Sequence, residues 1–162
     1  MSTEPTGTSP PAAPPSDWSR PGRTAARLAR HVEVSLGELD LTLSQYRVLM
    51  FLSERAELAS RLADSLAVTR PSVTAVVDGL VARGLVERRA CEGDRRRVEH
   101  VLTEAGRRLL SAADDQADDR LATVAAQLDD RQARDLLSGL HHWRGALDRY
   151  AVSRRAARTV IR

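Results

Sequence analysis

The sequence of 162 residues contains no lysine, a single cysteine and only five aromatic residues. Because Cys91 stands alone, the chain has no intramolecular disulfide of the kind that staples small secreted domains. With so few aromatic rings the core must consist mainly of Leu, Val and Ala, which favours packed helices over a β-sandwich. No apolar run approaches the roughly 18 residues of a membrane span, and the N-terminus lacks the apolar stretch of a secretory signal. We therefore expect a soluble, cytoplasmic protein with no membrane partner.

Arginine carries all of the basic charge. The 25 basic residues are all arginine and face 22 acidic residues, which leaves a formal net charge of +3. Arginine is always charged, and its planar fork matches phosphate groups and the edge of guanine. A bias in genome composition explains the total equally well, so the placement of the arginines is more informative than their number.

The chain divides into three parts. Residues 1–22 hold six of the seven prolines, mixed with Ser, Thr and Ala. Such a segment buries too little apolar surface to order itself, so we expect a disordered arm in which Trp18 alone can dock on the folded body. A single domain follows over residues 23–150, and residues 151–162 are expected to form a basic, frayed tail.

Helical periodicity covers most of the central domain. Apolar residues recur at spacings of three and four, which predicts helices over 24–39, 44–52, 58–66, 69–84, 103–128 and 136–150. Ser44, Thr69 and Thr103 are suited to cap three of these helices at their N-termini. The pattern indicates short strands over residues 85–89 and 98–102 instead, with a turn at Gly93-Asp94 between them. It therefore predicts one β-hairpin.

The helix over 69–84 has two contrasting faces. Val73, Val77 and Leu80 belong to one apolar stripe, whereas Arg70 and Thr74, with Ser72 beside them, are exposed near the N-terminus. Small, hydroxylated and basic residues allow a helix to enter the major groove closely, and the helix dipole favours phosphate at this end. An ordinary amphipathic surface helix has the same pattern.

The hairpin is rich in arginine. Five arginines and two acids lie between residues 88 and 97, and Arg95, Arg96 and Arg97 follow the turn directly. An arginine near a hairpin tip can enter the minor groove, where negative potential is concentrated, although a solvated charged hairpin is the alternative. The order of elements predicts a mainly α fold with a small β-hairpin wing: a winged helix-turn-helix with N- and C-terminal dimerisation helices.

Between residues 41 and 110 the sequence resembles the MarR family of bacterial regulators. The matching motifs are Leu-Val-Glu-Arg at 85–88, Asp-Arg-Arg at 94–96 and Leu-Thr-Glu-Ala-Gly at 102–106, with the segments 43–49, 62–69 and 72–74. The resemblance implies a triangular homodimer. Its winged helix-turn-helix spans 41–106, and helices within 24–39 and 104–150 pack across a two-fold axis. The recognition helices then enter successive major grooves of a palindrome, and the wings reach the flanking minor grooves.

The same resemblance assigns roles to individual residues. Thr69, Arg70, Ser72 and Thr74 become readers of bases or phosphates. Arg96 matches the wing arginine of the family, with Arg95 beside it and Asp94 expected to orient it through an ion pair. The sequence departs from the family in two places. Ala67 replaces a frequent glycine before the recognition helix, and Thr69 stands where some relatives have an acid that pairs with the wing arginine. Any contact that holds the wing against the recognition helix must therefore involve other residues in this chain.

A small anionic or aromatic effector is also implied by the family, in a cleft between the DNA-binding lobe and the dimer helices. Trp18, Asp64, Arg96 and Arg108 loosely resemble a set used by urate-responsive relatives, although those relatives have a helical N-terminal extension that the prolines here forbid. The alternative is that Asp64 and Arg108 are ordinary surface charges.

We expect no cofactor and no metal site, because the adjacent His141 and His142 point about 100° apart on a helix. Cys91 is expected to be inert, with oxidant sensing as the alternative. No motif of a phosphate-binding loop, a nucleophile elbow or a zinc site is present, so we expect no enzyme activity.

The sequence therefore predicts a ligand-responsive, sequence-specific regulator of transcription. It is expected to bind a palindromic operator in double-stranded DNA as a homodimer, with repression as the default role of the family. The alternative is a winged-helix protein-interaction module that has lost specific DNA reading.

Overall fold

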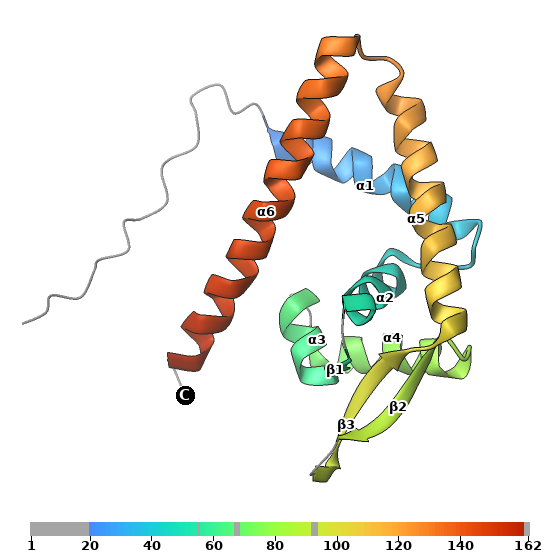
Figure 1. Cartoon of the computed structure of the whole chain (residues 1–162), viewed down its shortest axis with the longest axis vertical. Coiled ribbons are helices and arrows are strands. Elements are labelled where there is room, and N and C mark those ends of the chain that lie inside the picture. The colour runs from blue at the N-terminus through green and yellow to red at the C-terminus, as the bar shows by residue number, and fades with distance from the viewer. Residues whose placement is uncertain (1–19, 55, 67–68, 92–93, 161–162) are drawn as a thin grey trace, which may run out of the picture.

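The computed structural model describes residues 20–54, 56–66, 69–91 and 94–160, with the backbone alone at 57, 60, 64–65, 70, 95–96 and 154–160. Figure 1 shows a mainly helical chain with a small antiparallel sheet, as the sequence predicted. The elements are α1 (Pro21–Gly37), α2 (Leu43–Glu54), β1 (Glu57–Leu58), α3 (Ala59–Leu66), α4 (Arg70–Ala82), β2 (Val86–Cys91), β3 (Asp94–Leu102), α5 (Glu104–Ala125) and α6 (Asp130–Val160).

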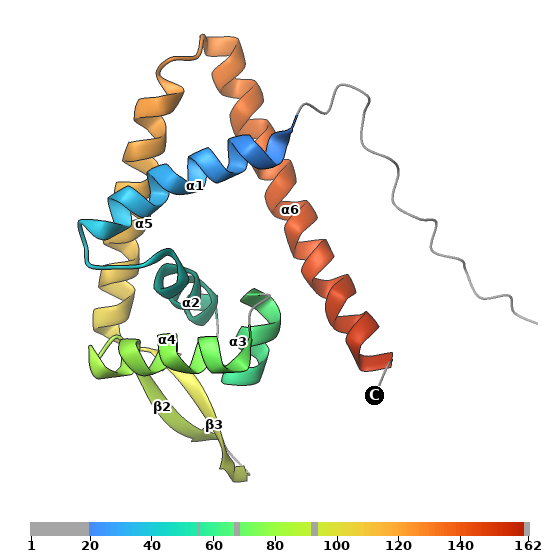
Figure 2. The ribbon, with the colours of Figure 1, turned by 180° about the vertical axis from the view of Figure 1, so that it is seen from behind.

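A lobe made of α2, α3, α4 and the sheet occupies one end of the molecule (Figures 1 and 2). From this lobe α5 extends away along the long axis, α1 packs across it, and α6 returns beside the lobe. The lobe has a continuous apolar core in which Val73, Val77 and Leu80 of α4 are fully buried. These three residues lie in the stripe predicted for this helix, and burying each side chain stabilises the fold by about 1.5–3 kcal/mol.

Helix α2 begins differently from the prediction. Ser44, expected as its cap, lies inside the helix, and Thr42 takes that role. The Thr42 hydroxyl accepts a hydrogen bond from the Gln45 amide at 3.2 Å, and the Gln45 side chain accepts one from the Thr42 amide at 2.9 Å. This reciprocal pair satisfies two backbone donors at once, whereas Ser44 would satisfy one.

The third helix is one residue shorter than predicted, because Leu58 belongs to a strand. Strand β1 pairs with β3 through Leu58 opposite Glu99, which gives a three-stranded sheet in the order β1-β3-β2. A strand of two residues has no periodicity to detect. Its identity depends entirely on a partner some forty residues later in the chain.

Two predicted tails are shorter than expected. Pro21 and Gly22 were assigned to the N-terminal arm, but they form the first turn of α1, where the fixed φ of proline suits a helix start. At the other end α6 continues to Val160, although fraying was predicted from residue 151. Ala and Arg, which dominate this stretch, have high helix propensity. None of the helices in the described ranges combines the length and apolarity needed to cross a membrane.

The start of α5 fixes how the sheet and α4 are placed relative to the long helices α1, α5 and α6, which we call the scaffold. Thr103 is its N-cap, as predicted, and accepts a hydrogen bond from the Gly106 amide at 3.0 Å. The same hydroxyl donates to the Gly84 carbonyl at 2.8 Å, in the turn that follows α4. Gly106 lies against that turn so closely that an added Cβ would stand 2.2 Å from the Leu85 carbonyl oxygen. Only glycine allows this contact between backbone and backbone.

We expect Gly106→Ala to lower the free energy of unfolding by about 1–3 kcal/mol, because the methyl group must push apart two backbone segments. Gly22→Ala serves as the control, since nothing lies within 4 Å of its added Cβ and alanine favours a helix. Urea denaturation of the two variants beside the wild type measures the difference. Equal midpoints for wild type and Gly106→Ala would contradict this account of the junction.

Candidate nucleic-acid interface

The N-terminus of α4 is a surface of small hydroxylated side chains. Thr69 caps the helix as predicted, with its hydroxyl accepting from the Ser72 amide at 3.4 Å and lying 2.7 Å from the Ser72 hydroxyl. Thr69, Ser72 and Thr74 are all exposed, and Ser72 also lines a shallow pocket beside Val73 and Val76. The helix therefore presents polar groups of low bulk at the end where its dipole is positive.

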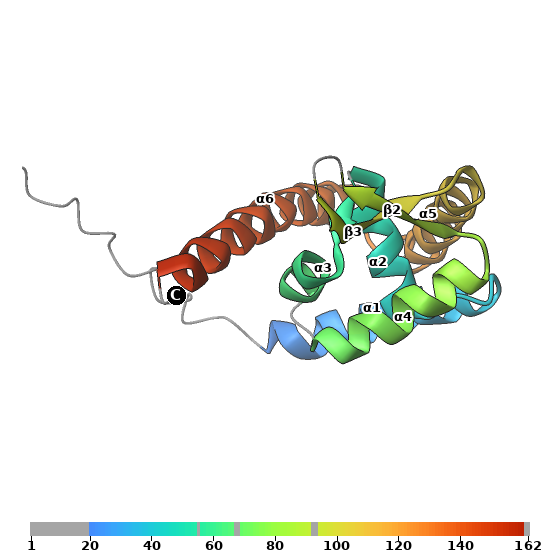
Figure 3. The same ribbon diagram turned by 90° about the horizontal axis from the view of Figure 1, so that it is seen from below.

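The arginine-rich hairpin lies on the same side of the lobe. Seen from below in Figure 3, α4 and the paired strands β2 and β3 face the viewer together. Figure 1 shows the hairpin projecting beyond α4 at this end of the molecule. Arg97 and Asp94 of β3 are exposed. A surface formed by a helix and a neighbouring basic hairpin has the form that winged-helix proteins use on duplex DNA.

Several predicted residues are placed only by their backbone. Arg70 is the first residue of α4, and Arg95 and Arg96 lie in β3, but their side chains fall outside the described part. The expected ion pair between Asp94 and Arg96 therefore stays a prediction. Thr69, Ser72, Thr74 and Asp94 are the DNA-binding candidates with described side chains.

The predicted effector set is placed only in part. Trp18 lies outside the described residues, as do the side chains of Asp64 and Arg96. Arg108 is exposed on α5 and forms an ion pair at 3.7 Å with Glu104, one turn earlier on the same helix. Among the side chains that the structure describes, no three His, Cys, Asp or Glu residues gather to hold a metal ion.

An ion pair that the sequence did not predict ties the hairpin to α4. Arg88 of β2 donates a hydrogen bond to the Asp78 carboxylate, and both side chains are about half exposed. Arg88 belongs to the Leu-Val-Glu-Arg motif and Asp78 to the polar side of α4, so both were visible in the sequence. Their pairing was not, because it requires knowing how the turn after α4 folds back.

A second interaction that the sequence did not predict joins the lobe to the scaffold. The Tyr46 hydroxyl of α2 donates to the Asp114 carboxylate of α5 at 2.5 Å. Burial raises the pKa of Tyr46 well above its usual value. The hydrogen bond to Asp114 and the charges of Asp114 and Asp118 raise this pKa further. The hydroxyl thus remains a protonated donor across the neutral range.

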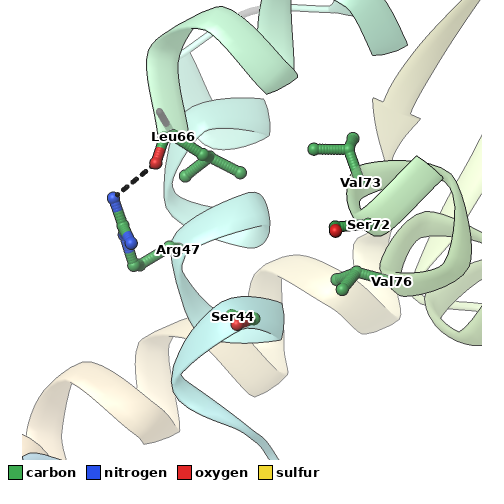
Figure 4. Close-up of a pocket in the computed structure, with 6 residues that line it drawn as sticks. All are labelled: Ser44, Arg47, Leu66, Ser72, Val73 and Val76. Atoms are coloured by element: carbon green, nitrogen blue, oxygen red, sulfur yellow. Dashed lines mark hydrogen bonds between the residues drawn. The ribbon is translucent and has the colours of Figure 1, made fainter. Parts of the chain in front are cut away.

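A shallow pocket lies between α2, α3 and the start of α4 (Figure 4). Its lining residues are Ser44, Arg47, Leu66, Ser72, Val73 and Val76. Arg47 donates a hydrogen bond to the Leu66 carbonyl at 3.2 Å and so caps the C-terminus of α3. The cavity volume is about 40 Å³, far below the roughly 300–1,000 Å³ typical of small-molecule sites.

Comparison with known proteins agrees with this geometry. The model of the MarR family matches residues 39–97. The HTH-type transcriptional regulator FarR of Neisseria gonorrhoeae is 30% identical over 117 residues, covering 70% of this chain and 80% of FarR. A MarR family protein of Mycobacterium tuberculosis, solved with p-aminosalicylic acid, is 29% identical with a TM-score of 0.64, covering 75% of this chain and 93% of that one.

A point mutant of S. aureus MepR bound to an oligodeoxyribonucleotide has the same fold, with a TM-score of 0.58 and 22% identity over 78% of this chain and 94% of that one. Family match, curated relative and fold agree with the resemblance noted in the sequence. The chain belongs to the MarR family of winged-helix transcription regulators, which are not enzymes.

Proposed function

We propose that the protein is a ligand-responsive repressor that binds a palindromic operator in double-stranded DNA as a homodimer. The observation that carries the proposal is the placement of the α4 N-terminus and the arginine-rich hairpin on one face (Figure 3). The hydroxyls of Thr69, Ser72 and Thr74 suit close approach to base edges and phosphates in the major groove. Arg96, two residues after the start of β3, is assigned to the flanking minor groove.

The DNA-bound MepR structure supports the proposed binding of DNA, because it shows that the same fold holds an oligodeoxyribonucleotide. The alternative of a protein-interaction module requires a recognition surface that has lost its basic residues. Arg70, Arg95 and Arg96 are all present in the sequence, which favours DNA. A gel-shift titration against the region upstream of the gene, with random duplex as competitor, tests the two functions against each other.

Dimerisation is supported by an exposed apolar stripe along α6. Its members recur at spacings of four and three and are 37–61% exposed: Leu136, Leu140, Trp143, Leu147 and Tyr150. Such a heptad-like stripe is the pattern of helices that pack against other helices. A second copy of the chain would cover it, and a two-fold protein matches a two-fold operator.

The effector part of the proposal rests on the Mycobacterium tuberculosis relative, which holds p-aminosalicylic acid. A small anionic aromatic compound of this kind would bind between the lobe and the dimer helices, where Arg108 offers a positive charge on α5. Trp18, Asp64 and Arg96 remain further candidates. The shallow pocket beside α4 is too small to be this site.

Sedimentation at micromolar concentration should show a dimer, and Leu140→Asp should shift the protein toward monomers with weaker operator binding. A carboxylate in the middle of the apolar stripe would be desolvated without a partner. Ser138→Asp adds the same charge on the opposite face of α6 and should leave the dimer intact. A wild-type monomer that binds the operator with full affinity would refute the dimeric arrangement.

Arg70→Ala and Thr74→Ala should each weaken the cognate operator more than random DNA, by about 1–3 kcal/mol for a lost base contact. Arg70 is the first residue of α4, and Thr74 is exposed one turn further along the helix. Ser111→Ala, on an exposed position of α5, is the control and should change neither affinity. Fluorescence anisotropy on the two duplexes measures the ratio. Equal losses on both would mean that these residues touch phosphate only.

Arg96→Ala should lower affinity, reduce the slope of log affinity against log salt by about one ion, and blunt any preference for A·T-rich flanks. An arginine in a narrow minor groove responds to groove width rather than to a unique base pattern. Arg131→Ala removes the same charge from α6, far along the chain from the wing, and should retain both properties. If Arg96→Ala keeps the wild-type slope and flank preference, Arg95 becomes the better candidate.

A further inference from the structure

The ion pair between Asp78 and Arg88 lies where the anchored part of the hairpin ends. At the hairpin base Val86 and Leu102 face each other and are both 2% exposed. Arg88 lies opposite His100, the last buried residue of this ladder, and beyond it Ala90 and Val98 are exposed. The Asp78 contact therefore meets the hairpin where apolar anchoring gives way to projecting strands.

Asp78 also connects this point to the reading surface. It lies one turn after Thr74 on α4, so the two residues share an exposed side of the helix. An acidic group on this side would repel the phosphates of bound DNA. The Arg88 guanidinium neutralises that charge and joins the helix to β2 in the same contact. Neither residue needs to touch a base for the contact to matter.

The angle between hairpin and helix has a large effect at the wing tip. Arg96 lies four residues from His100 along β3, which is about 13 Å in an extended strand. A tilt of about 10° at Arg88 would therefore move Arg96 by about 2 Å, a third of a minor groove that is about 6 Å wide. Holding this angle decides whether an arginine at the tip meets the groove.

We propose that Asp78 and Arg88 are a positioning pair that sets the angle of the wing on the recognition helix and thereby determines how the flanks of the operator are read. The inference rests on the proposed function, because it concerns the reading of DNA. The Asp78–Arg88 ion pair holds the wing against the recognition helix in a chain in which Thr69 replaces the acid that some relatives use for this contact.

The chain contains a matched control in the same strand. Arg89 of β2 pairs with Glu87, and the side chains of this second pair are also about half exposed. Both of its partners belong to β2, so it does not join the hairpin to α4. Asp78→Asn and Glu87→Gln each remove one negative charge that pairs with an arginine of β2, although Glu87 and Arg89 lie on the face of the strand opposite Arg88. Simple attraction to phosphate predicts that each substitution tightens binding to every duplex alike, whatever the sequence of its flanks.

The experiment measures the affinity of full-length wild type, Asp78→Asn and Glu87→Gln for two operators that differ only in A·T-rich or G·C-rich flanks. We expect Glu87→Gln to retain the wild-type ratio of the two affinities. Asp78→Asn should lower this ratio by about threefold or more despite the loss of a negative charge, because the wing is no longer held in register with the groove. The charge-swapped double variant Asp78→Arg with Arg88→Asp restores an ion pair and should recover the ratio.

Several outcomes would overturn the inference. It fails if Asp78→Asn has the same flank ratio as Glu87→Gln, or if the wild type has no flank preference. It also fails if Arg88→Ala weakens binding to all duplexes equally, as the loss of a simple phosphate contact does. Circular dichroism and thermal melting of each variant verify that the fold is retained. If neither wild type nor Glu87→Gln binds any duplex specifically, the proposed function itself fails, which is distinguishable from a selective effect at Asp78.

Discussion

The contact between Gly106 and the Leu85 carbonyl is the constraint around which the rest of the molecule is arranged. It brings the turn after α4 against the first turn of α5 with no side chain between them. Thr103 reinforces the junction by accepting from Gly106 and donating to Gly84. The recognition helix, the hairpin and the scaffold helix therefore meet at one point. Their relative directions are decided there by backbone sterics rather than by adaptable side chains.

Around this fixed point, and beside the apolar core, some contacts between elements are polar and adjustable. Tyr46 joins α2 to α5 through Asp114, and Arg83, the C-cap of α4, donates to the Asp40 carbonyl between α1 and α2 at 2.7 Å. Exposed or partly exposed polar contacts of this kind contribute modestly to stability and can be exchanged for water. The lobe thus combines one rigid junction with several replaceable ones. Such a combination suits the ligand response that we propose, in which the lobe would change its orientation relative to α5.

The features that sequence reasoning recovered depend on neighbours in the chain. The valine stripe of α4 and the caps Thr69 and Thr103 follow from residues three or four positions apart, and the structure has them as predicted. Ser44 was predicted to cap α2, but Thr42 caps it instead, because its reciprocal bonds with Gln45 satisfy two backbone donors.

What sequence reasoning missed depends on residues brought together by the fold. The Tyr46–Asp114 bond spans 68 positions, and strand β1 exists only because β3 returns beside it. The Asp78–Arg88 pair crosses just ten positions, yet it requires the geometry of the Gly84 turn, whose φ is +68°. Spacing within one element carries no information about such encounters. The predicted base readers were assigned from the pattern of the helix and from the family resemblance, neither of which shows a contact with DNA.

The connection between β3 and α5 has a mechanical consequence. Strand β3 ends at Leu102 and α5 begins at Glu104, so Thr103 alone separates them. The nine residues of the strand and the 22 of the helix each extend about 30 Å. Strand and helix form an equal-armed lever whose fulcrum is the junction at Gly106. A displacement of the far end of α5 would tilt α5 and the whole lobe together about this junction, and the wing tip would move by a similar distance in the opposite sense.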